Sequence, residues 1–188
     1  MEKKTIGIIV GSLRRESYNK KVALYLSGLL EEEFEVIFPD IGSLVMYNQD
    51  LDNDDELPPE WKSFREIIKS LDAVLFVTPE YNRSMPPVLK NALDIASRPP
   101  SENAWNAKPG AIVSVAPGKI GGFGANHHLR QSASCLNIYM MQDPEAYIGG
   151  IGDLLDENGI PNESTQGFLR KIAESFSNWV GIFSGSAG

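Results

Sequence analysis

The sequence predicts an α/β fold in which helices cover both faces of a parallel sheet. Five short apolar runs have the length and the β-branched character of buried strands. They alternate with five segments in which apolar residues recur every three or four positions, the period of a helix. Because crossovers between parallel strands are right-handed, this alternation predicts a three-layer α/β/α arrangement with one five-stranded sheet. No internal repeat is present, so residues 1–188 are expected to form a single domain.

The first half of the chain contains three of the predicted strands. Residues 5–10 form a β-branched run, as expected of a strand that is buried on both faces. Residues 18–30 follow with helical spacing of their apolar side chains. A second, short strand is predicted at 35–38 and a third at 73–77, with a helix between them at 61–71.

The second half repeats the same alternation. Helical spacing over residues 88–96 begins after two prolines, which a first helical turn tolerates, and stops before two more. A buried strand is predicted at 111–116, a helix at 123–136 and a fifth strand at 138–141. Helical spacing at 168–180 predicts a closing helix.

The composition is that of an ordinary globular domain. The length of 188 residues suits one domain at the rough prior of about 150 residues each. A hydrophobic fraction of 42% and a charged fraction of 22% exclude a disordered or collagen-like chain. Lys and Arg number 17 against 25 Asp and Glu, and the resulting net charge of −8 disfavours nucleic acid or an anionic membrane as a partner.

The sequence favours the cytoplasm. The single cysteine, Cys135, cannot form an internal disulfide, so the chain needs no oxidising compartment. The apolar run near the start is too short for a secretory signal, and no run of 18 apolar residues is available to span a membrane. Cys135 is expected in mid-helix among apolar residues, not at a helix start that would lower its pKa, so it is not a candidate nucleophile.

Ligands of open α/β sheets bind beyond the carboxyl ends of the strands, near a switch in strand order. The first strand-to-helix loop, residues 11–19, contains Ser12, Arg14, Ser17 and Asn19 and leads into a helix N-terminus. Its hydroxyl, amide, guanidinium and backbone N–H groups are donors that suit a phosphate. The alternative is that Ser17 only caps the helix and that the arginines are solvated.

Two further loops are unusual. In the strand order 2-1-3-4-5 the third strand adjoins the first, so the loop at residues 78–87 would share a crevice with the first loop. Its aromatic, its amide and its three prolines suit a rigid wall against a planar ring such as a flavin. The loop at 116–124 is glycine-rich, which lets a ligand approach the backbone. The alternatives without a ligand are that residues 78–87 are a proline-stiffened connector and that residues 116–124 are a flexible turn.

Several other kinds of site are excluded because the motifs they require are incomplete in this sequence. The Gly-Lys pair at 118–119 is followed by isoleucine, so there is no nucleotide-binding P-loop, and neither glycine-rich segment completes a dinucleotide fingerprint. The acidic residues 50–55 lack the glycine of an EF-hand and are interpreted as a solvated loop. His127 and His128 are adjacent, so on a helix they point in different directions and are expected at the surface or in an interface; no metal site is predicted.

Three groups of residues occur in an order that is typical of one enzyme family. They are Gly11-Ser12-Leu13-Arg14 with Ser17 and Asn19, Pro79-Glu80-Tyr81-Asn82 with Ser84, and Leu89-Lys90-Asn91-Ala92 with Ser97-Arg98-Pro99. Together they resemble the NADPH-dependent FMN reductase family, which includes bacterial chromate, quinone and azo reductases. The resemblance runs from the first strand to about Gly150, through Leu129-Arg130-Gln131 and Pro144-Glu145. It implies a flavodoxin-like fold with strand order 2-1-3-4-5.

The resemblance also implies a cofactor site. Loop residues of the first motif would bind the FMN phosphate, those of the second the ribityl chain and the isoalloxazine edge, and residues after the fourth strand would close the other side of the flavin. The implied cofactor-binding residues are Ser12, Leu13, Arg14, Ser17, Tyr18, Asn19, Pro79, Glu80, Tyr81, Asn82, Ala116, Pro117 and Gly118. No side chain is expected to be catalytic, because the flavin carries the chemistry.

The sequence departs from the family at three positions. Many relatives carry a glycine where Pro87 stands, which changes the backbone freedom near the substrate. Tetrameric relatives use an arginine and a tyrosine at positions that here are Gly124 and His127, although Glu145 matches. The expected assembly is therefore a homodimer or a homotetramer, without a choice between them.

The function that these features predict is an FMN-dependent NAD(P)H oxidoreductase with a ping-pong cycle. NAD(P)H would deliver hydride to flavin N5 and leave before an acceptor (a quinone, an azo compound, chromate or free flavin) collects the electrons. The alternatives are a flavodoxin-like carrier of single electrons and a scaffold without flavin. Arg15 or Arg83 could meet the 2′-phosphate of NADPH, but a solvated role suits each equally well, so the choice between NADPH and NADH stays open.

Overall fold

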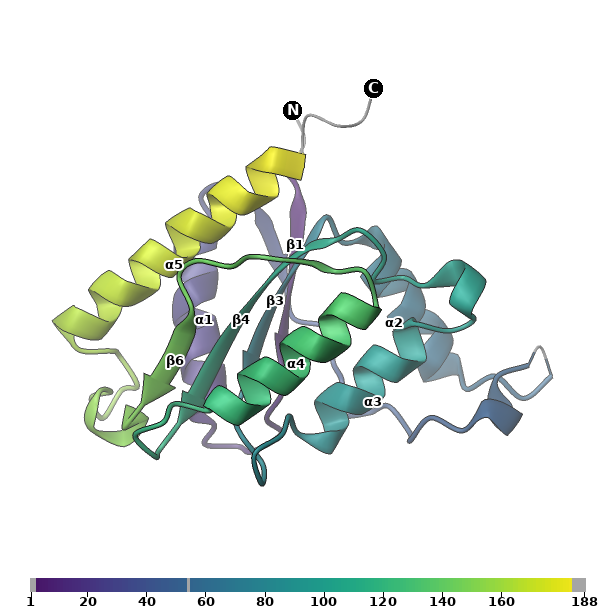
Figure 1. Ribbon diagram of the computed structural model, residues 1–188, viewed down its shortest axis with the longest axis horizontal. Helices are drawn as coiled ribbons and strands as arrows, with labels where there is room; N and C mark the ends of the chain where they lie inside the picture. The colour runs from purple at the N-terminus through teal and green to yellow at the C-terminus, as the bar shows by residue number, and fades with distance from the viewer. Residues whose placement is uncertain (1–2, 54, 184–188) are drawn as a thin grey trace.

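The central sheet has the predicted order. A computed structural model describes residues 3–53 and 55–183 of the chain (Figure 1). Its strands are parallel and lie in the order β2-β1-β3-β4-β5, with β6 also paired to β4. The strands are β1 (Thr5–Val10), β2 (Glu35–Ile37), β3 (Ala73–Thr78), β4 (Pro109–Ala116), β5 (Tyr139–Met140) and β6 (Ala146–Gly149). The flavodoxin-like α/β/α prediction is confirmed.

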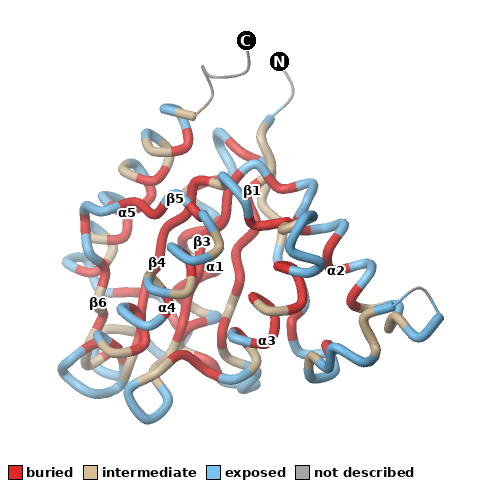
Figure 2. Tube along the Cα trace, turned by 45° about the vertical axis from the view of Figure 1, so that its right-hand side comes forward, coloured by how far each residue is buried: buried red, intermediate tan, exposed pale blue. Residues whose placement is uncertain are grey.

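Helices cover both faces of the sheet, as the alternating pattern predicts. One face carries α1 (Tyr18–Leu30) and α5 (Glu163–Ile182), and the other carries α2 (Pro59–Ser70), α3 (Pro87–Ala96) and α4 (Phe123–Cys135) (Figure 1). Successive strand residues point to opposite faces, so Ile8 belongs to the first core and Ile9 to the second. Figure 2 shows the buried residues along the strands and on the inner sides of the helices.

Capping residues and prolines set where the helices begin, and the spacing of apolar residues does not reveal them. The helix α1 has the predicted bounds, because Ser17 caps it by accepting a hydrogen bond from the Lys20 N–H. Pro87 is the first residue of α3, where a missing N–H costs nothing. The closing helix begins at Glu163, five residues before the prediction, because Asn162 caps a polar first turn that carries no apolar pattern.

The sheet has a sixth strand after the predicted fifth one. β5 pairs with the start of β4, and β6 pairs with its end, from Val113 to Ala116. Residues 142–145 between them leave the ladder, and they include Pro144, which has no N–H to donate. The strand predicted at 138–141 is confirmed as β5, whereas β6 was not predicted, because the four-residue run after the proline is too short to stand out in the sequence.

Two sequence-based interpretations are corrected on the surface. Cys135 is the last residue of α4 and is exposed, so it does not lie in mid-helix among apolar residues. The acidic loop is not wholly solvated, because Asp52 forms a two-pronged ion pair with Arg65, at 2.8 and 2.9 Å. Arg65 also donates from Nε to the Ile95 carbonyl, so this pair joins the loop to α2 and α3. The two side chains are only 9% and 12% exposed. Asp54, in the same loop, lies outside the described residues.

Among the described residues, no helix combines the length and the apolar character that a membrane span requires.

Candidate functional site

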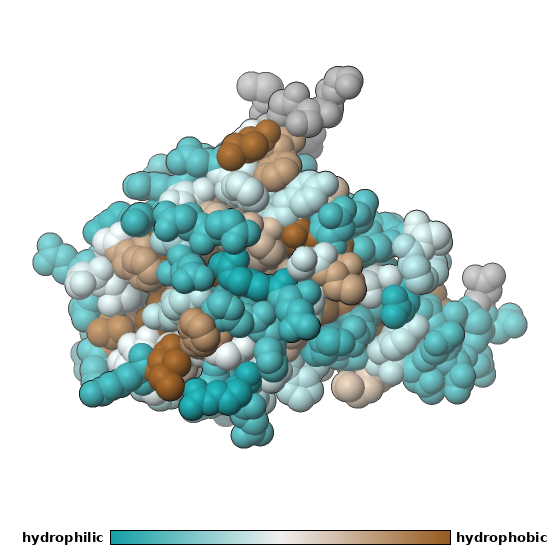
Figure 3. Space-filling view, in the orientation of Figure 1, coloured by the Kyte–Doolittle hydropathy of each residue, from teal (hydrophilic) through white to brown (hydrophobic). Residues whose placement is uncertain are grey.

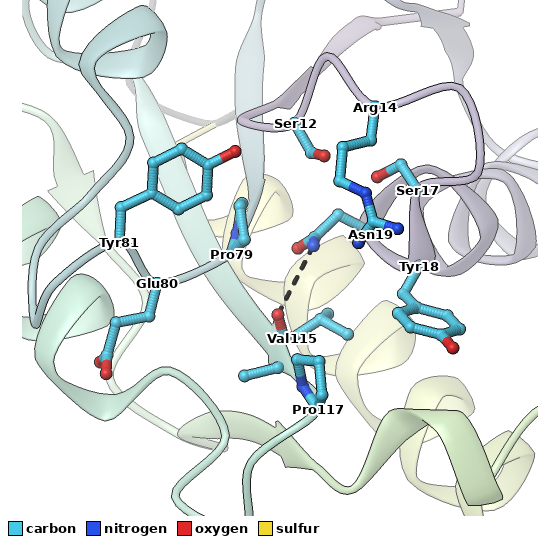
Figure 4. Close-up of a pocket in the computed structure, with 11 residues that line it drawn as sticks. Ser12, Arg14, Ser17, Tyr18, Asn19, Pro79, Glu80, Tyr81, Val115 and Pro117 are labelled. Atoms are coloured by element: carbon cyan, nitrogen blue, oxygen red, sulfur yellow. Dashed lines mark hydrogen bonds between the residues drawn. The ribbon is translucent and has the colours of Figure 1, made fainter.

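A pocket lies at the carboxyl edge of the sheet, where the loops after β1, β3 and β4 meet (Figure 4). Val10, Val77 and Val113 are register partners across these three strands, so the strands end side by side. The pocket has a volume of about 130 Å³. Its lining residues are Ser12, Arg14, Ser17, Tyr18, Asn19, Pro79, Glu80, Tyr81, Val115, Ala116 and Pro117.

The turn after β1 starts with a glycine for a steric reason. Gly11 donates its backbone N–H to the Val77 carbonyl at 2.9 Å, which holds the first loop against β3. A Cβ at Gly11 would lie 3.0 Å from Thr78 Oγ1 and 3.3 Å from a Leu89 methyl carbon. Glycine therefore lets the first and second loops approach each other closely enough to line one pocket.

Polar side chains of the first loop converge inside the pocket. In Figure 4 the Arg14 guanidinium lies close to Ser17 and Asn19, and Ser12 lies beside them. Ser17 also caps α1, so the pocket receives the partial positive charge of a helix N-terminus. The combination of cation, hydroxyls and helix N-terminus suits an anion such as a phosphate.

Asn19 contributes a buried polar atom without a partner. Its side chain is 5% exposed, and Nδ2 donates to the Val115 carbonyl at 3.5 Å. Oδ1 is buried, and within the described part of the chain it is the buried side-chain polar atom that lacks a hydrogen-bond partner. Leaving such an acceptor unsatisfied costs about 1–3 kcal/mol, so a ligand hydroxyl that donates to it would gain binding energy.

The second loop forms a tight turn with a strained backbone. Tyr81 and Ser84 exchange two backbone hydrogen bonds, at 2.8 and 2.9 Å. Between them, Asn82 and Arg83 both have positive φ, at 51° and 68°. Asparagine tolerates this region, whereas arginine pays roughly 1–2 kcal/mol for it. The turn holds Tyr81, which is 45% exposed, as one wall of the pocket.

Glu80 joins the second loop to α4. Its carboxylate points away from the pocket in Figure 4 and accepts a hydrogen bond from the Ala125 N–H at 3.1 Å. The N-cap residue of α4 is Gly122, which has no side chain, so Glu80 supplies the cap from another loop. A Cβ at Gly124 would lie 2.7 Å from the Arg83 carbonyl oxygen and 2.9 Å from Glu80 Oε2. A side chain at Gly124 would therefore require the Arg83 backbone to shift.

Removal of the Glu80 cap is expected to loosen both loops. We predict that Glu80→Ala lowers the free energy of unfolding by about 0.5–2 kcal/mol, the cost of losing a helix cap. It should also release bound flavin several-fold faster, measured by the recovery of FMN fluorescence after dilution. Glu80→Gln keeps an acceptor oxygen for the Ala125 N–H and serves as the control. Equal release from the alanine and glutamine variants would contradict this role.

The third loop is fixed from inside the fold. Ser114 donates from Oγ to the Gly121 carbonyl at 2.7 Å. Asn126 donates to Ser114 Oγ and to the Ala146 carbonyl, at 3.3 and 3.4 Å. Gly121 has φ +66°, and a Cβ there would lie 2.6 Å from the Tyr147 backbone. The glycine-rich loop is therefore held against β6 and is not a free turn.

The structure brings most of the predicted site residues together. Leu13, Asn82 and Gly118 do not line the pocket: Leu13 packs towards Gly42, Asn82 lies in the tight turn, and Gly118 accepts backbone hydrogen bonds through its carbonyl oxygen. Val115 lines the pocket but was not predicted, because it reads as an ordinary strand residue. Its carbonyl contact with Asn19 is the feature that places it there.

The two adjacent histidines have separate partners, as their spacing predicts. His127 Nε2 lies 3.1 Å from the Tyr147 hydroxyl, and His128 Nδ1 lies 3.0 Å from Ser84 Oγ. Burial, together with a hydrogen bond to Glu145, raises the pKa of Tyr147 to about 12. Tyr147 therefore stays protonated at neutral pH. Its position beside His127 belongs to the surface of α4 and β6, outside the pocket.

The comparisons with known proteins agree with this architecture. Residues 5–153 match the NADPH-dependent FMN reductase family. The chain belongs to the NADPH-dependent FMN reductase family. A quinone reductase of Pseudomonas putida is 52% identical to this family member over 177 residues, which are 94% of each chain. A 2-hydroxy-1,4-benzoquinone reductase of Burkholderia sp is 45% identical over 176 residues, 93% of this chain and 95% of that one.

Solved structures extend the comparison to the fold. FerB, a flavoenzyme NAD(P)H:(acceptor) oxidoreductase from Paracoccus denitrificans, has a TM-score of 0.89 at 38% identity and covers 95% of this chain and 98% of its own. An archaeal flavodoxin has a TM-score of 0.65 at 12% identity, over 94% of this chain and 99% of its own, a similarity of fold alone. This reductase is an FMN-dependent NAD(P)H oxidoreductase.

The pocket fits the phosphate and ribityl end of FMN. The cation and helix N-terminus suit the phosphate, and the unpartnered Asn19 Oδ1 suits a donating hydroxyl of the ribityl chain. The volume of about 130 Å³ is small beside the roughly 300–1,000 Å³ of typical ligand pockets. A pocket of this size would hold part of an FMN molecule.

Proposed function

We propose that this reductase transfers electrons from NAD(P)H through bound FMN to quinones by a ping-pong mechanism. The observation that carries the proposal is one pocket in which Arg14 and the hydroxyls at the start of α1 lie opposite the loops after β3 and β4. The names of the Pseudomonas putida and Burkholderia relatives support quinones as the acceptor class. Azo compounds, chromate and free flavin are further acceptors that an open ring face would admit.

We assign the phosphate to the first loop. The hydroxyls of Ser12 and Ser17 and the backbone N–H groups at the start of α1 would donate to the phosphate oxygens. Arg14 would offset the phosphate charge, since its guanidinium lies in the same pocket. Asn19 Oδ1 would accept from the ribityl chain.

We assign the flavin ring to the second and third loops. The backbone of residues 79–82 would line one edge of the ring, and residues 116–118 would line the other. Bound FMN supplies the redox chemistry, accepting hydride from NAD(P)H and passing two electrons to the acceptor. The protein orients the ring through rigid loops, and no side chain of the chain is assigned a catalytic proton transfer.

The remaining expectations complete the proposal. Residues 3–53 and 55–183 form one domain, and the enzyme acts in the cytoplasm, where an exposed thiol such as that of Cys135 stays reduced. Small-molecule substrates are its partners, not nucleic acid or membrane. We also propose a homodimer or homotetramer. The face in Figure 3 is mainly hydrophilic with separate hydrophobic patches, and the 57% exposed Ile120 and the 48% exposed Phe123 offer a second copy an apolar contact near α4.

Steady-state kinetics test the proposal. The FMN-loaded protein should oxidise NAD(P)H in the presence of 1,4-benzoquinone, and double-reciprocal plots at several quinone concentrations should be parallel. Under anaerobic conditions and without quinone, one equivalent of NADPH per bound FMN should bleach the flavin absorbance. Bleaching with neither NADPH nor NADH would instead favour an electron carrier, and intersecting lines would contradict the ping-pong order.

A further inference from the structure

A second hollow lies at the same edge of the sheet, between the loop after β1 and the segment that follows β2. Its volume is about 570 Å³, larger than that of the flavin pocket. The two cavities share Ser12 and Arg14, so they adjoin each other at the first loop. The proposed roles of the flavin-binding residues leave this hollow without a ligand.

Three partly exposed apolar side chains line the hollow. Leu13, Leu24 and Phe38 come from three different segments, and they are 61%, 54% and 41% exposed. One methyl carbon of Leu13 also lies 3.0 Å from the position that a Cβ on Gly42 would take. Large apolar side chains that gather at one exposed hollow mark a binding surface more often than single exposed ones do. Their arrangement suits a planar heterocycle.

The rim of the hollow is cationic although the protein is acidic. The chain has a net charge of −8, yet within residues 3–53 and 55–183 neither Arg14, Arg15 nor Lys20 forms an ion pair. The neighbouring Lys21, by contrast, pairs with Glu16 at 3.8 Å. One carboxylate, Asp40, also lines the hollow, and its Oδ1 accepts a hydrogen bond from the Gly42 N–H. Asp40 thus has a second oxygen that can accept from a ribose hydroxyl or an adenine amino group.

The position of the hollow matches a ligand that extends along the sheet edge. The hollow lies beyond β2 and β1, and the flavin pocket lies beyond β1, β3 and β4, with the proposed ring site at its β3–β4 end. Neighbouring strands are about 4.8 Å apart, so the hollow and the ring site are separated by about 10 Å along the edge. An extended dinucleotide spans this separation, with one end on the flavin ring and the other in the hollow.

We propose that the hollow binds the 2′-phosphoadenosine end of NADPH, with the adenine on Leu13, Leu24 and Phe38 and the 2′-phosphate facing Arg15 and Lys20. The inference rests on the proposed function, because it assigns the second end of the hydride donor. The sequence offered two arginines, Arg15 and Arg83, as contacts for the 2′-phosphate, and the inference chooses Arg15. Arg83 pairs with Glu80 at 3.3 Å, whereas Arg15 lines the hollow without such a pair.

The double variant R15Q/K20Q tests the assignment. We expect its KM for NADPH to rise at least about 10-fold while kcat and the KM for NADH stay within about twofold of the parent, because only NADPH carries the 2′-phosphate. K21Q removes a cation from the next residue of the same helix, outside the hollow, and should change neither KM. Equal KM changes for NADPH and NADH in R15Q/K20Q would overturn the proposal.

Calorimetric titration of the FMN-loaded protein tests the site without turnover. Adenosine 2′-monophosphate should bind at least about 10-fold more tightly than adenosine 5′-monophosphate or inorganic phosphate, and R15Q/K20Q should remove this preference. Leu24→Asp, on an exposed helix face, should weaken both nucleotides. Equal affinity for the two nucleotides, or for phosphate alone, would overturn the assignment. A protein that oxidises neither NADPH nor NADH would contradict the proposed function, while this titration would still report on the hollow.

Discussion

Ser17→Asp is expected to weaken FMN binding by about 100-fold while leaving α1 intact. Aspartate is as good an N-cap as serine, so it can still accept from the Lys20 N–H. The new carboxylate, however, would face the phosphate of FMN in the same pocket. Like charges in contact cost several kcal/mol, and a 100-fold loss corresponds to about 2.7 kcal/mol. Titration of the apoprotein with FMN, followed by quenching of flavin fluorescence, measures the loss.

Two comparisons isolate the charge. Ser17→Asn also caps helices but carries no charge, so its FMN affinity should stay within about fivefold of the parent. Riboflavin has no phosphate, and its affinity should be nearly the same in the parent and in Ser17→Asp. If riboflavin lost affinity as strongly as FMN, the aspartate would be acting through the structure of the loop and not through the phosphate.

Asp52→Ala is expected to lower the free energy of unfolding by about 3–5 kcal/mol. The Arg65 side chain is 9% exposed and meets Asp52 through two nitrogens, so removal of the carboxylate leaves a cation that is mostly out of water. Urea denaturation followed by circular dichroism measures the change. Asp52 is outside the flavin pocket, so the FMN affinity of the folded variant should stay that of the parent.

A surface pair provides the matched control for this prediction. Lys90 and Asp94 also lie 2.7 Å apart, but their side chains are 49% and 42% exposed, and Asp94→Ala should cost less than about 1 kcal/mol. The double variant Asp52→Ala/Arg65→Met should recover much of the loss, because it removes the unpaired cation. Equal losses in the free energy of unfolding for Asp52→Ala and Asp94→Ala would show that burial does not increase the contribution of the Asp52 pair to stability.

The strand order and the site loops could be predicted because each depends on short-range patterns. A buried parallel strand such as β3 is apolar along its whole length, and an amphipathic helix such as α2 repeats its apolar residues with the helical period. Ligand loops then follow from the rule that sites lie beyond the carboxyl ends of the strands. The first loop shows its chemistry directly, through hydroxyls and a guanidinium at a helix N-terminus.

Contacts between distant segments could not be predicted. Glu80 reads as part of a motif, and only the fold shows that it caps α4 across 45 positions of sequence. Asp52 reads as one of several acids in a polar loop, and its partner Arg65 is identified only once α2 is in place. In the same way Leu13 belongs to the first motif, but the backbone turns its side chain towards Gly42, away from the flavin pocket.

The segment between β5 and β6 is a place where this domain could accept an insertion. β5 pairs with the start of β4 and β6 pairs with its end. Residues 142–145 connect the two strands and are not themselves paired with β4. Gln142 and Asp143 are exposed there, ahead of the buried Pro144. Extra chain is tolerated best where it displaces neither buried side chains nor ladder hydrogen bonds. A module inserted beside Gln142 and Asp143 would extend from residues that do not line the flavin pocket.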